Sequence, residues 1–213
     1  MARTRTHRDG CGIAHAADLL SERWALVVIR ELLLGPKRFT DLRTAIPDIS
    51  PNVLGQRLRE LEESGIVSRQ KLPPPAAARV YELTEWGQEL EPAVLALGRW
   101  ATRSDSFPRD GEMGSDSMVL AIKAAFDEEV AAGLNATYGL EFGEEAFRIE
   151  VSDGELTASR GEAEDPDALI HTDPDTMAAL VFRGKRLANM VEGGAVRIDG
   201  SRRAVKVLLR ALT

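Results

Sequence analysis

The feature that most constrains the fold is a polar stretch in the middle of the chain, from Ser104 to Ser115. It contains one proline and two glycines and has neither helical nor strand periodicity, which is typical of a linker. The 213-residue chain is long enough for one compact domain on each side of it. We predict domains over residues 1–103 and 116–213, joined by a linker over residues 104–115.

The charge of the chain is divided unevenly between these two parts. Residues 1–103 hold 15 Lys and Arg against 13 Asp and Glu, whereas the remainder holds 12 against 21. The overall charge of -7 therefore comes from the second half. Such asymmetry indicates domains with different partners, and it leaves the first half able to bind an anionic one.

Several classes of protein are disfavoured by what the sequence lacks. No apolar run of about 18 residues is present, so we expect no contact with a membrane, and no apolar signal core follows the basic residues 1–8, so we expect a cytoplasmic protein. The single cysteine, Cys11, excludes an internal disulfide framework and a cysteine-rich metal site. His7, His15 and His171 have no metal-ligand spacing, so we expect neither metal nor cofactor.

Helical patterns dominate the first half, and a pair of short strands interrupts them. Helices are predicted over Ile13–Leu20, Trp24–Leu34, Thr40–Ala45, Pro51–Ser64 and Glu85–Arg103, and strands over Ile66–Leu72 and Arg79–Leu83. This is the order of a winged helix-turn-helix domain. In such domains the later helix of the motif enters the major groove of DNA, and the wing touches the backbone or minor groove.

The predicted recognition helix begins with favourable capping residues, Ser50 at the N-cap and Pro51 in the first turn. Leu54, Leu58 and Leu61 share one face and would anchor the helix to the core. We predict DNA contacts from its remaining faces, mostly in the first turns: Ser50, Asn52, Val53, Gln56, Arg57 and Arg59. Asn and Gln pair with adenine, Arg with guanine or phosphate, and Val with a thymine methyl group.

The predicted wing is basic. Arg69, Lys71 and Arg79 would place positive charge along phosphates. An exposed Gln- and Arg-rich helix face is, by itself, more typical of solvated surface. The order of the elements, the Ser-Pro start and the basic wing together favour double-stranded DNA as the partner.

Residues 11–103 resemble the HxlR family of bacterial regulators, which are related to the MarR group. The resemblance lies in Cys11 and Ile13, Arg23-Trp24, residues 29–32, 38–42 and Ile46, Ile49-Ser50, Leu54, residues 57–61, residues 65–67 and Arg69, and residues 79–84 with Gly87. It implies a homodimer, joined through the first and last helices of the domain, on a roughly palindromic site. Gly12 stands where the family usually has proline, and residues 73–78 make a longer, more apolar wing tip than usual.

The family resemblance also draws attention to Cys11, because a cysteine at this position sometimes senses oxidants or electrophiles. Sensing would need an accessible thiolate with a lowered pKa, which Arg8 or the start of a helix would favour. The alternative, which we favour, is a packed or merely inherited thiol near the dimer interface.

The second half is predicted to be α+β. Strands are predicted over Ala136–Phe142, Phe147–Val151, Glu155–Arg160 and Ala195–Asp199, and helices over 119–130, from Asp173-Pro174 onward, and from Ser201 to Leu212. Asp153-Gly154 is a strong hairpin turn.

The second half has no visible catalytic constellation, so we expect no enzyme. Nine apolar residues near its end are candidates for contact with a small ligand: Met177, Leu180, Val181, Leu187, Met190, Val196, Val205, Leu208 and Leu209. For each of them separately, a place in the ordinary core is the simpler interpretation.

A resemblance to the sterol-carrier-protein-type lipid-binding domain lies in residues 168–173, Met177, Leu180, residues 184–185, 190–193 and 196–200, and the closing helix. The resemblance implies a sheet covered by helices, with an apolar tunnel for a hydrophobic ligand between them. Its polar contacts could come from His171, Arg183 or Asn189.

The sequence thus supports a DNA-binding repressor whose second domain binds a hydrophobic effector. Two alternatives stay open: a regulator controlled through Cys11, and a carrier of hydrophobic molecules that uses the winged helix only to dimerise.

Overall fold

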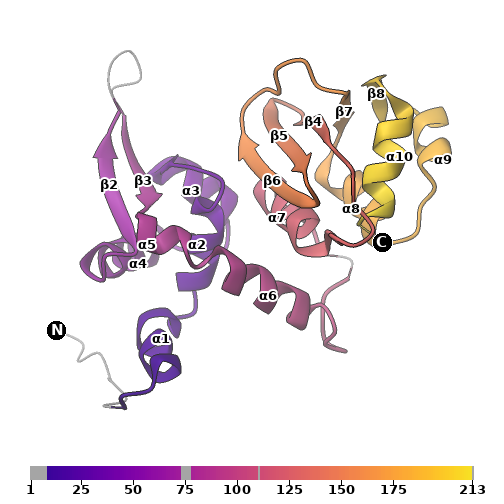
Figure 1. The fold of residues 1–213 in the computed structure, drawn as a ribbon. Helices are drawn as coiled ribbons and strands as arrows, with labels where there is room; N and C mark the ends of the chain where they lie inside the picture. The colour runs from indigo at the N-terminus through magenta and orange to yellow at the C-terminus, as the bar shows by residue number, and fades with distance from the viewer. Residues whose placement is uncertain (1–8, 73–77, 110, 213) are drawn as a thin grey trace. The chain divides into compact units, whose positions relative to one another are not determined.

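The structure, a computed structural model, describes residues 9–72, 78–109 and 111–212. The chain divides into two compact units, residues 1–94 and 95–213 (Figure 1). The division falls inside the helix α6 (Glu91–Ala101), earlier than the predicted linker. Residues 102–109 and 111–114, where the linker was predicted, contain turns and coil but no helix or strand.

The first unit has the element order predicted from the sequence. Its helices are α1 (Gly12–Leu20), α2 (Ala25–Leu32), α3 (Phe39–Ala45), α4 (Pro51–Glu63) and α5 (Glu85–Gln88), and its strands are β1 (Lys37–Arg38), β2 (Val67–Lys71) and β3 (Arg79–Leu83). The strands form an antiparallel sheet in the order β1-β3-β2. The predicted helices before the hairpin and both wing strands are confirmed, whereas β1 is too short to give a periodic signal.

The single helix predicted over Glu85–Arg103 is wrong, because the structure has two helices there, α5 and α6. Pro92 has no amide hydrogen, so it cannot donate a hydrogen bond to the carbonyl of Gln88. The turn before it is tightened instead, with the Leu90 amide 3.2 Å from the Gly87 carbonyl oxygen. A proline tolerated in the first turn of α6 therefore ends the helix that precedes it.

Helix α5 is held close to the start of the wing through Thr84 and Gly87. The Thr84 hydroxyl donates to the Gly65 carbonyl at 2.7 Å and accepts from the Gly87 amide at 3.0 Å. A Cβ atom on Gly87 would lie 2.2 Å from the carbonyl oxygen of Ile66. Only glycine therefore allows α5 to approach the hairpin this closely.

The substitution Gly87→Ala is expected to destabilise the protein by about 1–3 kcal/mol, because backbone must move to relieve the contact. Gly55→Ala is the matched control. Gly55 also lies in a helix, but the nearest atom to its added Cβ would be 3.8 Å away. Alanine there should stabilise α4 by up to about 1 kcal/mol. Urea denaturation of both variants measures the difference, and equal stability would contradict the close-approach argument.

The second unit is an α+β domain built on a five-stranded sheet. Its helices are α7 (Ser115–Ala125), α8 (Pro174–Phe182), α9 (Leu187–Glu192) and α10 (Arg202–Arg210), and its strands are β4 (Ala136–Phe142), β5 (Glu145–Ser152), β6 (Glu155–Arg160), β7 (Ala168–Thr172) and β8 (Arg197–Gly200). The sheet order is β6-β5-β4-β7-β8, and β4 and β7 are its parallel pair. The four predicted strands are confirmed within a few residues.

Helix α10 covers one face of this sheet. The Tyr138 hydroxyl, from β4, donates to the Ala204 carbonyl of α10 at 3.2 Å. Burial raises the pKa of Tyr138 to about 12, and the negative charge of Asp167 adds to the effect. The phenol therefore keeps its proton and remains a donor to α10.

The helix predicted over 119–130 ends at Ala125, so its last turn was predicted wrongly. The Asp127 amide donates instead to the Ala211 carbonyl at 2.8 Å. The Asp127 carboxylate accepts from the Glu129 and Val130 amides at 3.0 Å each. This local turn competes with the helix, and it leaves Val130 56% exposed.

Candidate nucleic-acid interface

Helix α4 presents a neutral, exposed end where the recognition helix was predicted. The Ser50 hydroxyl caps it by accepting a hydrogen bond from the Val53 amide at 3.4 Å. Leu54, Leu58 and Leu61 are buried and fix the opposite face. Of the predicted contact residues on this helix and its cap, Ser50, Asn52, Val53, Gln56 and Arg59 are exposed. The anchor predicted from the leucine spacing is thus present.

Arg57 does not share this exposure. Its side chain is 9% exposed and forms ion pairs with Glu60 and, at 3.4 Å, with Glu22. A guanidinium held by two carboxylates is poorly placed for a base or a phosphate. The flank position on the helix indicated exposure, but Glu22, which precedes α2, and the turn of α4 enclose the side chain. We therefore leave Arg57 out of the interface.

The amide of Gln56 has a partner within the same helix. Its Nε2 atom donates to Glu60 Oε1 at 2.9 Å. Reading a base with Gln56 would require this hydrogen bond to open, a small cost at an exposed site.

The three predicted wing cations lie on one face of the hairpin. Lys71 and Arg79 are opposite each other in the β2–β3 register, and Arg69 is opposite Tyr81. Successive side chains alternate between faces of a strand, so these cations share a face, and all three are exposed. The Arg69 guanidinium lies 5.7 Å from the Tyr81 ring centroid. Lys71 and Arg79 repel each other in the free protein, and an anion bound between them would reduce this repulsion. The predicted wing tip, residues 73–77, lies outside the described residues.

Two exposed cations near α3 were missed by the sequence argument. Arg38 is the N-cap residue of α3, and its amide donates to Asp41 Oδ2 at 2.9 Å. Arg43 lies in the last turn of the same helix. α3 is the first helix of the helix-turn-helix pair, which crosses the DNA backbone in such domains. The sequence offered one signal for these two cations, because they lie at the ends of the helix that precedes α4.

Cys11 is exposed at the N-cap of α1. Hydrogen bonds from the backbone amides of Ile13 and Ala14 lower the pKa of the thiol. The single chain therefore leaves this thiol accessible, whereas its place near the dimer interface stays a prediction. Arg8, the other predicted influence, lies outside the described residues.

Most of the nine predicted ligand residues belong to the interior of the second unit. Six are buried: Met177, Leu180, Val181, Val196, Val205 and Leu208. Leu187, Met190 and Leu209 are half-buried, and α9, which carries two of them, has no fully buried residue. Most of the candidates are therefore core residues of the second unit. Those on α9 are less buried.

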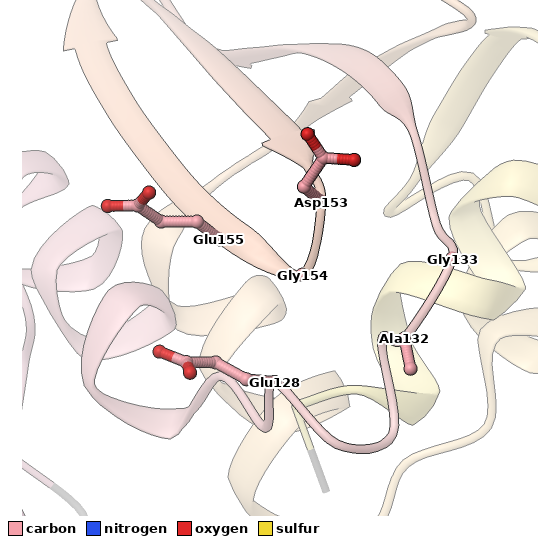
Figure 2. A pocket seen from close by; sticks show the side chains of 6 residues that line it. All are labelled: Glu128, Ala132, Gly133, Asp153, Gly154 and Glu155. Carbon is pink, nitrogen blue, oxygen red and sulfur yellow. The ribbon is translucent and has the colours of Figure 1, made fainter.

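A surface hollow of about 550 Å³ in the same unit lies elsewhere (Figure 2). It is lined by Glu128, Ala132 and Gly133, which follow α7, and by Asp153, Gly154 and Glu155, at the β5–β6 turn. Three of its six residues are acidic, and none of the nine apolar candidates lines it. It therefore does not have the character of a site for an apolar ligand.

His171 also lies away from the apolar interior. Its Nδ1 is 2.6 Å from Glu141 Oε2, and its Nε2 is 2.8 Å from Asp199 Oδ2. His171 pairs in register with Glu141, which alternates with Tyr138 and so faces away from α10. The predicted role of His171 in the tunnel is therefore wrong, whereas Arg183 and Asn189 are exposed.

The described residues contain no group of three or more His, Cys, Asp or Glu side chains placed to hold a metal ion. Across the same residues, no helix is both long and apolar enough to cross a bilayer.

Comparisons with known proteins divide the chain in a similar way. Residues 19–106 match the family described as HxlR-like helix-turn-helix, and residues 113–213 match the family described as Alkyl sulfatase C-terminal. The sterol-carrier resemblance of the second unit is not among these matches.

Related regulators are similar to part of this chain. The uncharacterized HTH-type transcriptional regulator YvaP of Bacillus subtilis is 39% identical over 41% of this chain and 81% of its own length. The HTH-type transcriptional regulator YodB of the same organism is 40% identical over 46% of this chain and 84% of its own. A solved structure, the reduced form of YodB, is 39% identical, covers 48% of this chain and 98% of that one, and has a TM-score of 0.40.

Proposed function

Because this chain belongs to the HxlR-like helix-turn-helix family of transcriptional regulators, we propose that it binds a near-palindromic operator as a homodimer and represses transcription there. The observation that carries the proposal is that neutral and cationic side chains are exposed on different elements of the first unit. Neutral side chains are exposed at the start of α4, where bases would be read, and cations line one face of the wing.

The proposed DNA contacts follow from this separation of neutral and cationic side chains. Ser50, Asn52, Val53 and Gln56 face the bases. Arg59, Arg69, Lys71 and Arg79, together with Arg38 and Arg43 of α3, neutralise phosphates.

The test is selection of bound fragments from the genomic DNA of the source organism at near-physiological salt, where nonspecific phosphate binding is weak. Enrichment of a few near-palindromic sites is expected. A protein that retains no sequence preference, yet binds hydrophobic molecules, would instead be the carrier that we considered as an alternative.

Helices α1 and α6 supply the proposed dimer interface. Neither has a buried residue in the single chain, and both carry exposed apolar side chains. Ile13 is 82% exposed, Leu97 48% and Trp100 66%. Covering them removes apolar surface from water, which favours association.

The double substitution Ile13→Glu/Trp100→Glu is expected to convert the dimer to a monomer and to weaken operator binding, since each half-site contact would act alone. Sedimentation equilibrium measures the first effect. Phe182→Glu is the matched control, because Phe182 is also exposed and apolar but lies in α8, outside the two helices of the proposed interface. An unchanged dimer in the double variant would contradict this interface.

For the second unit we propose an effector role, with a hydrophobic small molecule binding beneath α9. Support comes from the partial burial of that helix: Leu187 and Met190 are half-buried, and α9 has no fully buried residue. A ligand there would change DNA affinity only as far as it prefers one conformation of the dimer. A chain ending at Arg103 that still binds DNA and still responds to a fluorescent fatty acid would contradict the proposal.

A second mode of control is supported by Cys11, whose exposure and lowered pKa favour the thiolate. Oxidation to a disulfide would have to join two subunits, since the chain has one cysteine. The test compares the loss of DNA binding after diamide treatment in the parent protein and in Cys11→Ser. An identical response would remove Cys11 from the mechanism.

A further inference from the structure

The basic residues of the second unit are concentrated at its end. Residues 104–182 hold four Lys and Arg against 19 Asp and Glu, whereas residues 183–213 hold eight against two. All eight of these cations are exposed. An acidic unit therefore carries one positive region.

Helix α10 gathers four of these cations on one face. At about 100° per residue, Arg202, Arg203, Lys206 and Arg210 span an arc of roughly 100°. Val205 and Leu208 occupy the opposite face and are buried. Among the described residues, no carboxylate forms an ion pair with Arg202, Arg203 or Lys206.

Two of the cations lie where a helix disfavours them. Arg202 and Arg203 occupy the first turn of α10, which contains no acidic residue. The positive end of the helix dipole repels cations there, at a cost of about 0.3–1 kcal/mol each. Helix stability therefore does not account for their presence, but an anion bound at this face would.

We propose that the cationic face of α10 is a second DNA-contacting surface, which binds backbone phosphates beside the operator without reading sequence. The inference rests on DNA binding by the first unit and adds a role for the second that requires no effector. Duplex DNA presents one negative charge per about 1.7 Å of axis, so a face about 10 Å long meets several phosphates.

A lipid surface is the other large anion that such a helix could meet, and the structure disfavours it. Helices that lie in membranes insert an apolar face among the lipids. The apolar face of α10 is already occupied by the sheet, through Val205, Leu208 and the bond from Tyr138 to Ala204. Every exposed residue of α10 is an arginine or a lysine.

Tethering strengthens the argument for DNA. Once the first unit is bound, the second is confined near the duplex, so even weak phosphate contacts add to the affinity. The 19 acidic side chains of residues 104–182 are repelled by the same phosphates, which favours orientations that turn α10 toward the DNA.

The experiment uses the full chain with Arg202→Gln, Arg203→Gln and Lys206→Gln combined. Binding to a random-sequence duplex is measured by fluorescence anisotropy over a series of salt concentrations. The slope of log affinity against log salt is expected to fall in magnitude by about 2–3 for each subunit of the dimer that contacts the duplex, because each phosphate contact contributes about 0.9. Preference for operator over random DNA should not change.

The matched control keeps the charges at the same positions: Arg202→Lys, Arg203→Lys and Lys206→Arg should retain the parent slope. Thermal unfolding provides a second readout, since the glutamine variant should be as stable as the parent or slightly more stable. Weaker DNA binding therefore cannot be attributed to misfolding.

An unchanged slope in the glutamine variant, with normal binding by the parent protein, overturns this inference and leaves the regulator function intact. If the parent protein does not bind duplex DNA at all, both fail. If instead the variant loses sedimentation with phosphatidylglycerol vesicles while its DNA slope is unchanged, the face is a membrane contact and the proposal is wrong.

Discussion

The double substitution Asn52→Ala/Gln56→Ala is expected to weaken operator binding by at least about thirty-fold, while binding to random DNA stays nearly the same. Each well-placed amide–base pair contributes about 1–3 kcal/mol of discrimination. Two such pairs contribute at least about 2 kcal/mol, and every 1.4 kcal/mol is about a factor of ten. Both side chains are exposed and neutral, so their loss should not alter the salt dependence.

The wing provides the contrasting variant. Lys71→Gln/Arg79→Gln removes two cations from one face of the hairpin. It should weaken binding to operator and to random DNA to the same extent and reduce the salt slope by about 2 for each bound subunit. Anisotropy titrations on both duplexes separate the two effects. A uniform loss in the Asn52/Gln56 variant would show that α4 positions the protein and does not read bases.

The second large effect is expected at Lys37, whose replacement by methionine should destabilise the protein by about 3–5 kcal/mol. Lys37 is 6% exposed and Glu31 is 2% exposed, and the Lys37 Nζ lies 2.6 Å from Glu31 Oε2. The other carboxylate oxygen, Oε1, is bound by the Arg30 side chain at 2.7 Å. Removing the ammonium leaves a buried charge without one of its principal partners.

A companion variant makes this prediction specific. Lys37→Met/Glu31→Leu removes both charges and should recover most of the lost stability, because apolar replacements of buried ion pairs are often neutral. Guanidinium denaturation of the parent, both single variants and the double variant gives the coupling free energy directly. If Lys37→Met lowers the free energy of unfolding by less than about 1 kcal/mol, the buried Glu31 carboxylate does not depend on Lys37 as its partner, and the prediction is wrong.

Much of the fold followed from local sequence. The Ser50-Pro51 start, the leucines at positions 54, 58 and 61, and Gly65 each act within a few residues, so α4 and its anchored face were predictable. The wing strands and the Asp153-Gly154 turn were predictable for the same reason. The break between α5 and α6 also has a local cause, because it depends on Pro92. It was missed because the apolar periodicity of residues 85–103 favours one continuous helix.

Tertiary contacts decided the rest. Arg57 has the helical position of an exposed side chain, yet it is buried and forms an ion pair with Glu22, which is distant in sequence. His171 was expected inside a tunnel, but its strand register places it on the other sheet face with Glu141 and Asp199. The sequence by itself determined which segments form helices and strands, because capping and periodicity are short-range. Only the tertiary structure decided which charges are buried and paired and which, like those of α10, are left exposed, since that depends on residues far apart in the chain.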